Sequence, residues 1–167
     1  LSCPGNNKLI MVDCGSRGMG SSGYSKEYAT EIAGEILNLK LIDDASITVI
    51  ITRGRISAYN YLPLLFPTRV TMKKISKIYI GGLYPEHYAN TAIGNWIKTL
   101  SSAIGSSNVF SGTTRITQGT TDLQLCGTGL TDVKTYILAN AADAANDGNV
   151  DDNTLAFYFT YSAFRVL

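Results

Sequence analysis

The chain has 167 residues, enough for one domain with a substantial core, and its formal net charge of +1 creates no overall field that would attract nucleic acid or anionic lipid. Hydrophobic residues make up 45% and charged residues only 16%; Gly, Ser, Thr, Asn and ten Tyr supply much of the remainder. No apolar run approaches the ~18 residues of a membrane-spanning helix. We therefore expect one domain over residues 1–167, with 1–7 as an N-terminal arm, and neither nucleic-acid binding nor membrane insertion.

The three cysteines, Cys3, Cys14 and Cys126, include no Cys-x-x-Cys pair, which argues against a structural zinc site. We expect Cys14 and Cys126 to be small buried hydrophobic residues. Cys3 lies in the polar arm and is the cysteine most available for a disulfide. The low charge and the polar, tyrosine-rich composition favour an extracellular, cell-surface or virion-associated protein.

The first third of the chain predicts a β-α-β unit. Residues 8–13 form a short apolar run, followed by a glycine-rich turn and then by 25–40, whose apolar residues share one helical face. Residues 47–52 (ITVIIT) are a β-branched run typical of a core strand. Such a unit has a right-handed crossover, and α/β proteins place their sites at the carboxyl ends of its strands.

The rest of the chain alternates between further strand and helix patterns. We expect an irregular apolar segment at 56–67, a helix at 69–76, a strand at 77–83, a helix at 88–104, short strands at 108–110, 122–125 and 135–139, and a closing helix at 155–166. The Gly81–Gly82 pair indicates a bulge or a close backbone approach. The predicted fold is a single α/β domain: a mixed, mostly parallel sheet with helices on both faces.

The order of these segments resembles that of the zinc-dependent N-acetylmuramoyl-L-alanine amidases, which cut peptidoglycan. LIMVDCGSRGMGSSGYSKE looks like the family's first strand, its Asp-x-Gly-His-Gly turn and the Glu that follows. Four later segments stand where the family has its second strand, its helix-opening Arg, its Ser-x-His-Ala-Asn segment and its last strand: ITVIITR, FPTRV, KIYIGGLYPEHYAN and TYILAN. The resemblance covers nearly the whole chain and depends on this succession.

The resemblance implies a zinc site that has lost most of its ligands. The family binds zinc with two His and one Glu, and a further Glu acts as general base. In this chain the first His falls at Ser16, the ligand Glu near Glu27, and the general base at Ala139. The second His falls close to Leu83 in one register, or at His87 by the local match HYAN. Glu27 and His87 are thus the remnant ligand candidates, and we expect neither a catalytic residue nor a bound cofactor.

Three functions from different classes follow from these observations. The first, which we favour, is a non-catalytic amidase-like domain that assembles with itself or other structural proteins, or binds peptidoglycan, at a cell surface or in a phage-type particle. The second is an active zinc amidase with substitute ligands. The third is a phosphate- or nucleotide-binding protein that holds the anion at Gly18, Gly20 and Gly23, before the N-terminus of a helix.

Two weaker patterns remain. Residues 143–152 (DAANDGNVDD) resemble half of a calcium loop, with Asp143, Asp147 and Asp151 as the candidate ligands, but the bidentate Glu that ends such loops is missing. We favour a solvated acidic turn there. Cys14 and His87 form a conceivable Cys–His pair, but no third residue that would orient the histidine is identified.

Overall fold

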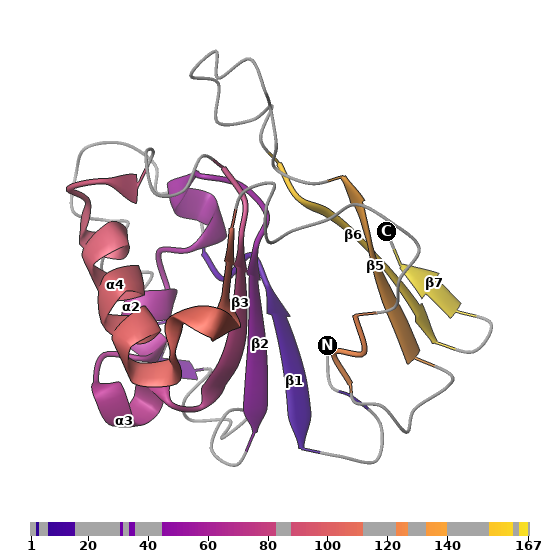
Figure 1. The fold of residues 1–167 in the computed structure, drawn as a ribbon, viewed down its shortest axis with the longest axis horizontal. Helices are drawn as coiled ribbons and strands as arrows, with labels where there is room; N and C mark the ends of the chain where they lie inside the picture. The colour runs from indigo at the N-terminus through magenta and orange to yellow at the C-terminus, as the bar shows by residue number, and fades with distance from the viewer. Residues whose placement is uncertain are drawn as a thin grey trace.

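The structure, a computed structural model, describes residues 3, 7–15, 31, 34–35, 45–82, 88–111, 123–126, 133–139, 154–161 and 164–166 (Figure 1). Its centre is a four-stranded sheet in the order β1-β2-β3-β4, and all its pairings are parallel. The strands are β1 (Lys8–Val12), β2 (Ser46–Ile51), β3 (Ile75–Ile80) and β4 (Val109–Ser111). In β2 every residue after Ser46 is buried, as expected for a central parallel strand covered on both faces.

Helices cover one face of this sheet (Figure 1). They are η1 (Ile56–Ala58), α2 (Leu62–Leu65), α3 (Arg69–Met72), α4 (Ala92–Ile104) and η3 (Ser106–Asn108). The Thr91 side chain caps α4 by accepting a hydrogen bond from the Gly94 amide. The Trp96 indole donates to the Phe66 carbonyl oxygen over 2.9 Å, which fixes α4 on the segment that follows α2. Trp96 is therefore a core residue, as predicted.

A second sheet covers the opposite face. It is antiparallel, in the order β5-β6-β7, and consists of β5 (Val133–Ala139), β6 (Ala156–Tyr161) and β7 (Phe164–Val166). Leu155 and Phe157 pack in one buried cluster with Ile50 and Tyr79 of the parallel sheet. Phe157 meets the Tyr79 ring edge-on, with 5.7 Å between the centroids. The antiparallel sheet is thus attached to the parallel sheet through an aromatic core.

The predicted α/β class and the mostly parallel sheet are confirmed. In the described part of the chain, however, the second covering layer is the β5-β6-β7 sheet, where helices were expected on both faces. Only Glu31, Gly34 and Glu35 of the helix predicted at 25–40 are described, and all three are helical. The helix predicted at 69–76 ends at Met72, because Ile75 enters β3 and is buried in the core.

The closing helix predicted at 155–166 is wrong: this segment forms β6 and β7. Its sequence AFYFTY alternates, so Phe157 and Phe159 pack on the cluster against the parallel sheet, whereas Tyr158 pairs with Tyr136 of β5. The short strand predicted at 122–125 is also wrong. Leu123 donates a single backbone hydrogen bond to the Thr135 carbonyl oxygen, and the described residues 123–126 are not in a strand.

Candidate functional site

The carboxyl ends of β1 and β2 are joined by one acidic side chain. The Asp13 carboxylate accepts a 2.8 Å hydrogen bond from the Thr52 amide and a 2.6 Å bond from the Thr52 hydroxyl. Both are charge-assisted and short. Asp13 also has a left-handed backbone conformation, with φ of 47°, which Asp tolerates better than most residues. Asp13, which follows β1, therefore connects the carboxyl ends of β1 and β2.

The neighbouring Cys14 is buried and is not part of a disulfide. Its carbonyl oxygen accepts a hydrogen bond from the Tyr61 amide. Burial raises the pKa of the thiol to about 12, so at neutral pH the sulfur keeps its proton. Because the thiolate is the nucleophilic form of cysteine, this position is poorly suited to covalent catalysis. Its predicted role as a small buried hydrophobic residue is confirmed.

Tyr88 lies over the end of β3. Its hydroxyl donates a 2.7 Å hydrogen bond to the Gly81 carbonyl oxygen, and its ring lies 5.8 Å from that of Tyr59. Burial raises the pKa of Tyr88, and the charges of Tyr59 and Asp13 raise it further. The phenol therefore stays protonated at neutral pH and serves as a hydrogen-bond donor.

The Gly81–Gly82 pair allows the backbones after β2 and β3 to approach closely, as the sequence predicted. A side chain at Gly81 would collide with the Thr52 carbonyl oxygen, and a Cβ at Gly82 would lie 2.7 Å from the Gly54 nitrogen. Gly82 also has φ of +73°, a conformation that favours glycine. The three strand ends at this edge are thus held together by backbone contact, Asp13 and Tyr88.

The second sheet reaches the same edge. The Leu155 amide donates a 2.7 Å hydrogen bond to the Thr52 carbonyl oxygen, and Ala156 pairs with Ala139 across β6 and β5. Ala139, which the amidase resemblance would place at the general-base position, therefore approaches the carboxyl edge from a separate sheet. Alanine has neither a carboxylate nor any other side-chain donor, so this position does not fit a zinc amidase.

The other predicted site residues lie outside the described part of the chain. These are Ser16, Glu27, Leu83 and His87 of the amidase-like site, Gly18, Gly20 and Gly23 of the glycine turn, and Asp143, Asp147 and Asp151 of the acidic segment. A Ser16 hydroxyl does not replace an imidazole ligand. Within the described residues, no three His, Cys, Asp or Glu side chains gather where a metal ion would be held. Nor do these residues include a helix that is long and apolar enough to cross a membrane.

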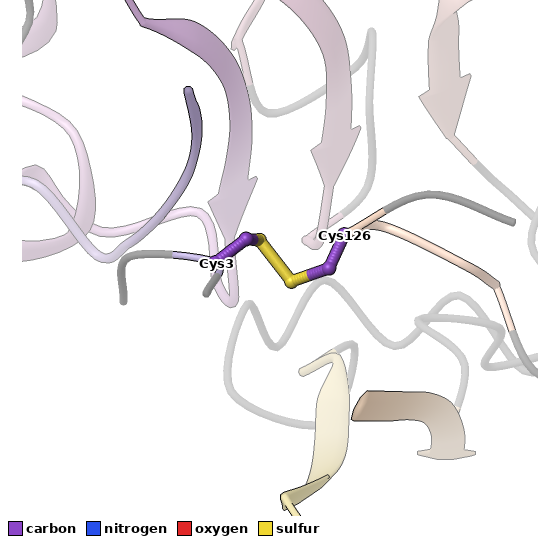
Figure 2. The surroundings of a disulfide bond; sticks show 2 residues. All are labelled: Cys3 and Cys126. Atoms are coloured by element: carbon purple, nitrogen blue, oxygen red, sulfur yellow. A yellow bond between two sulfur atoms is a disulfide. The ribbon is translucent and has the colours of Figure 1, made fainter. Parts of the chain in front are cut away.

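The disulfide joins Cys3 to Cys126 (Figure 2), 123 positions apart in the sequence. Both cysteines are buried in the cluster between the two sheets. Cys126 is buried, as expected, but it is also the disulfide partner of Cys3, the cysteine expected to be most available for a bridge. The Cys3 amide donates to the Lys8 carbonyl oxygen, which holds Cys3 beside the start of β1. No local sequence signal identified Cys126 as the partner.

Fold and edge together define the class: an α/β domain whose parallel sheet is packed between helices and an antiparallel sheet, with a disulfide in the cluster between the two sheets. No family model, curated protein or solved structure matches the chain. The amidase resemblance therefore stays a prediction, and the function must be argued from the site.

Proposed function

We propose that this chain is a non-catalytic α/β domain that acts by assembly, with copies of itself or with other structural proteins. One observation carries the proposal: the Asp13 carboxylate at the carboxyl edge already accepts two hydrogen bonds from Thr52. Catalysis at such an edge needs a group that is free to exchange protons with a substrate or to attack it. Asp13 instead connects two strands.

The neighbouring groups support the same conclusion. The Cys14 thiol is buried and protonated, and the Tyr88 hydroxyl is directed at the Gly81 carbonyl oxygen. Ala139 has no acid–base function at the position where the amidases carry their general base. Asp13 and Tyr88 thus hold strand ends together, and the Cys14 thiol is shielded by burial. A role in binding and assembly fits this arrangement better than turnover does.

The disulfide supports a location outside the reducing cytosol. Such bonds persist in secreted, cell-surface and virion proteins and are rare where thioredoxin and glutathione keep thiols reduced. The bond between Cys3 and Cys126 lies inside a packed cluster, as a structural disulfide does. We therefore propose an extracellular, cell-surface or virion-associated protein, with peptidoglycan as the polymer that an amidase-like surface would contact.

The test measures turnover, zinc content and association on the same preparation. We expect no release of peptide from peptidoglycan with or without added Zn²⁺, substoichiometric zinc by elemental analysis, and a mass above that of the monomer in light scattering at high concentration. Stoichiometric zinc together with peptide release would overturn the proposal in favour of the active amidase. Thr52→Val serves as a control, because it removes the hydroxyl that donates to the Asp13 carboxylate and adds no metal ligand.

A further inference from the structure

The described helical residues carry two exposed surfaces of opposite charge. The first consists of Arg69 in α3, Lys73 at its C-cap and Lys98 in α4, and we call it the basic surface; all three side chains are exposed. The Arg69 guanidinium donates to the Ser102 carbonyl oxygen over 3.4 Å, and the Ser102 hydroxyl donates to the Lys98 carbonyl oxygen. The Lys73 amide in turn donates to the Arg69 carbonyl oxygen. These bonds bring the three positive charges together where α3 meets α4.

The second surface consists of Glu31, Gly34 and Glu35, and we call it the acidic surface. The three residues are helical, and both glutamate side chains are exposed. Residues three or four positions apart share one face of a helix, so the two carboxylates lie together. A Cβ built on Gly34 would meet no atom within 4 Å. The acidic surface thus presents two negative charges beside open space.

The charges of both surfaces are available to a second molecule. Within the described part of the chain, none of the five charged side chains forms an ion pair. The acidic residues of that part are Asp13, Glu31 and Glu35, and the Asp13 carboxylate is already bonded to Thr52. In a second copy of the chain, Glu31 and Glu35 are therefore the described groups that can complement the basic surface.

Both surfaces lie on the same side of the parallel sheet. The strands follow one another in the order β1-β2-β3-β4, and α3 and α4 belong to the connections from β2 to β3 and from β3 to β4, on the face that the helices cover (Figure 1). Connections between parallel strands are right-handed, so every step in one direction along the sheet crosses the same face. Glu31, Gly34 and Glu35 belong to the step from β1 to β2. The acidic surface thus lies toward the β1 end of the helical face, and the basic surface lies toward the β4 end.

This arrangement makes the helical face complementary to itself. Building on the assembly function proposed above, we propose that two copies of the chain form a dimer through this face, with the basic surface of each copy on the acidic surface of the other. Because the two surfaces lie toward opposite ends of one face, a two-fold axis between the copies forms both contacts at once. The interface is therefore isologous, and it closes at the dimer.

The contact combines several ion pairs with an apolar side chain. Exposed ion pairs contribute little singly, but the two-fold axis doubles their number. Val70 follows Arg69 in α3 and is the most exposed large hydrophobic residue described, at 78%. The open space beside Gly34 of the other copy can accept it. Because most of the attraction is between exposed charges, we expect a dimer that weakens as salt is added.

Sedimentation equilibrium on the full chain, at low and high salt, measures the dissociation constant of this dimer. Lys73→Glu changes the basic surface, and Lys134→Glu makes the same change of net charge at an exposed position on β5 of the other sheet. We expect Lys73→Glu to raise the dissociation constant about tenfold, because it acts in both symmetry-related contacts, and Lys134→Glu to change it less than about twofold.

A mixture of two double variants tests the pairing itself. One variant carries Lys73→Glu with Lys98→Glu, which leaves the bond from Arg69 to Ser102 intact, and the other carries Glu31→Lys with Glu35→Lys. Each variant alone places like charges against each other and should stay monomeric. An equimolar mixture should form a heterodimer, because both of its contacts again join opposite charges. Association of the mixture would also show that both variants are folded.

A wild-type chain that stays monomeric at about 1 mM in low salt overturns the dimer. Equal effects of Lys73→Glu and Lys134→Glu also overturn it, because they would reflect net charge alone, and so does a mixture that associates no better than its two components. Association that persists in both double variants would overturn this interface and leave the proposed assembly function standing. Zinc-dependent turnover would instead count against the proposed function, whichever surface mediates association.

Discussion

Asp13 and Thr52 lie 39 positions apart in the sequence, yet the Asp13 carboxylate accepts hydrogen bonds from both the Thr52 amide and the Thr52 hydroxyl. The pair joins the ends of two adjacent parallel strands. The Thr52 carbonyl oxygen meanwhile accepts the Leu155 amide, so a single residue connects the parallel sheet to both Asp13 and the chain that enters β6. In the described part of the chain, these bonds join the carboxyl ends of the strands to one another.

Replacing Asp13 should therefore destabilise the domain. We expect Asp13→Ala to lower the free energy of unfolding by about 2–3 kcal/mol, because it removes two charge-assisted bonds and places Ala in a left-handed conformation. Asp13→Asn should cost about 1 kcal/mol less than Asp13→Ala, since its amide oxygen still accepts the Thr52 amide and Asn tolerates that conformation. Urea unfolding monitored by circular dichroism measures both. A negligible loss in Asp13→Ala would show that the carboxylate junction is unimportant.

The disulfide should make stability dependent on redox conditions. It closes a loop of more than 100 residues, for which chain-entropy arguments give about 4–5 kcal/mol. We expect dithiothreitol to lower the unfolding midpoint of the wild-type chain markedly, and to leave that of a Cys3→Ala/Cys126→Ala variant unchanged. Cys14 is not bonded and is retained in both proteins. A dithiothreitol effect of the same size in the double variant would contradict a link between Cys3 and Cys126.

Alkaline pH should destabilise the fold. Burial raises the pKa of Cys14 to about 12 from an ordinary value of 9.0, and it also raises the pKa of Tyr88 above its ordinary 10.0. Because both folded-state pKa values are raised, the unfolded chain loses its protons first. Stability is therefore full below pH 9.0 and declines as pH rises above it, by about 1.4 kcal/mol per pH unit for each group that ionises only when unfolded.

Chemical denaturation at pH values between 7 and 11 tests this decline, with Cys14→Ala and Tyr88→Phe as controls. Each substitution should flatten the alkaline slope, because it removes one of the groups whose pKa burial raises. The Cys14 thiol should also react with an aromatic disulfide reagent only as fast as the chain unfolds. Rapid labelling of native protein at pH 8 would contradict the buried, protonated thiol.

Two glycines should respond to substitution in opposite ways. A Cβ on Gly81 collides with the Thr52 carbonyl oxygen, whereas a Cβ on Gly34 meets no atom within 4 Å. Gly34 is helical, so Gly34→Ala should raise the free energy of unfolding by about 0.5–1 kcal/mol. Gly81→Ala should lower it by more than about 2 kcal/mol, because two strand ends must separate. Thermal unfolding of the two variants measures both signs, and destabilisation by Gly34→Ala would contradict a helical site with open space around the added Cβ.

The predictions from sequence were most accurate where the signal was local. The β-branched run at 47–52 became β2, and the amphipathic pattern of 88–104 became α4, which begins at Ala92 after its Thr91 cap. At the C-terminus the aromatic residues of 155–166 were assigned to a helix, although they alternate along a strand. In a short apolar run, the helical and the strand period cannot be told apart until it is known what the run packs against. At the candidate site, the sequence located Asp13 and Cys14 at the end of a strand and predicted the close backbone approach at Gly81–Gly82.

By itself, then, the sequence determined the strands of the parallel core, because strand propensity and turn residues act over only a few neighbouring positions. It also determined which residue types are available at the sheet edge. The tertiary structure alone decided that Asp13 bonds to Thr52, that Cys3 is linked to Cys126, and that a second sheet covers the face of the parallel sheet opposite the helices. These pairings join residues far apart in the chain. No local pattern encodes them, because they form only when the burial of apolar surface brings the segments together.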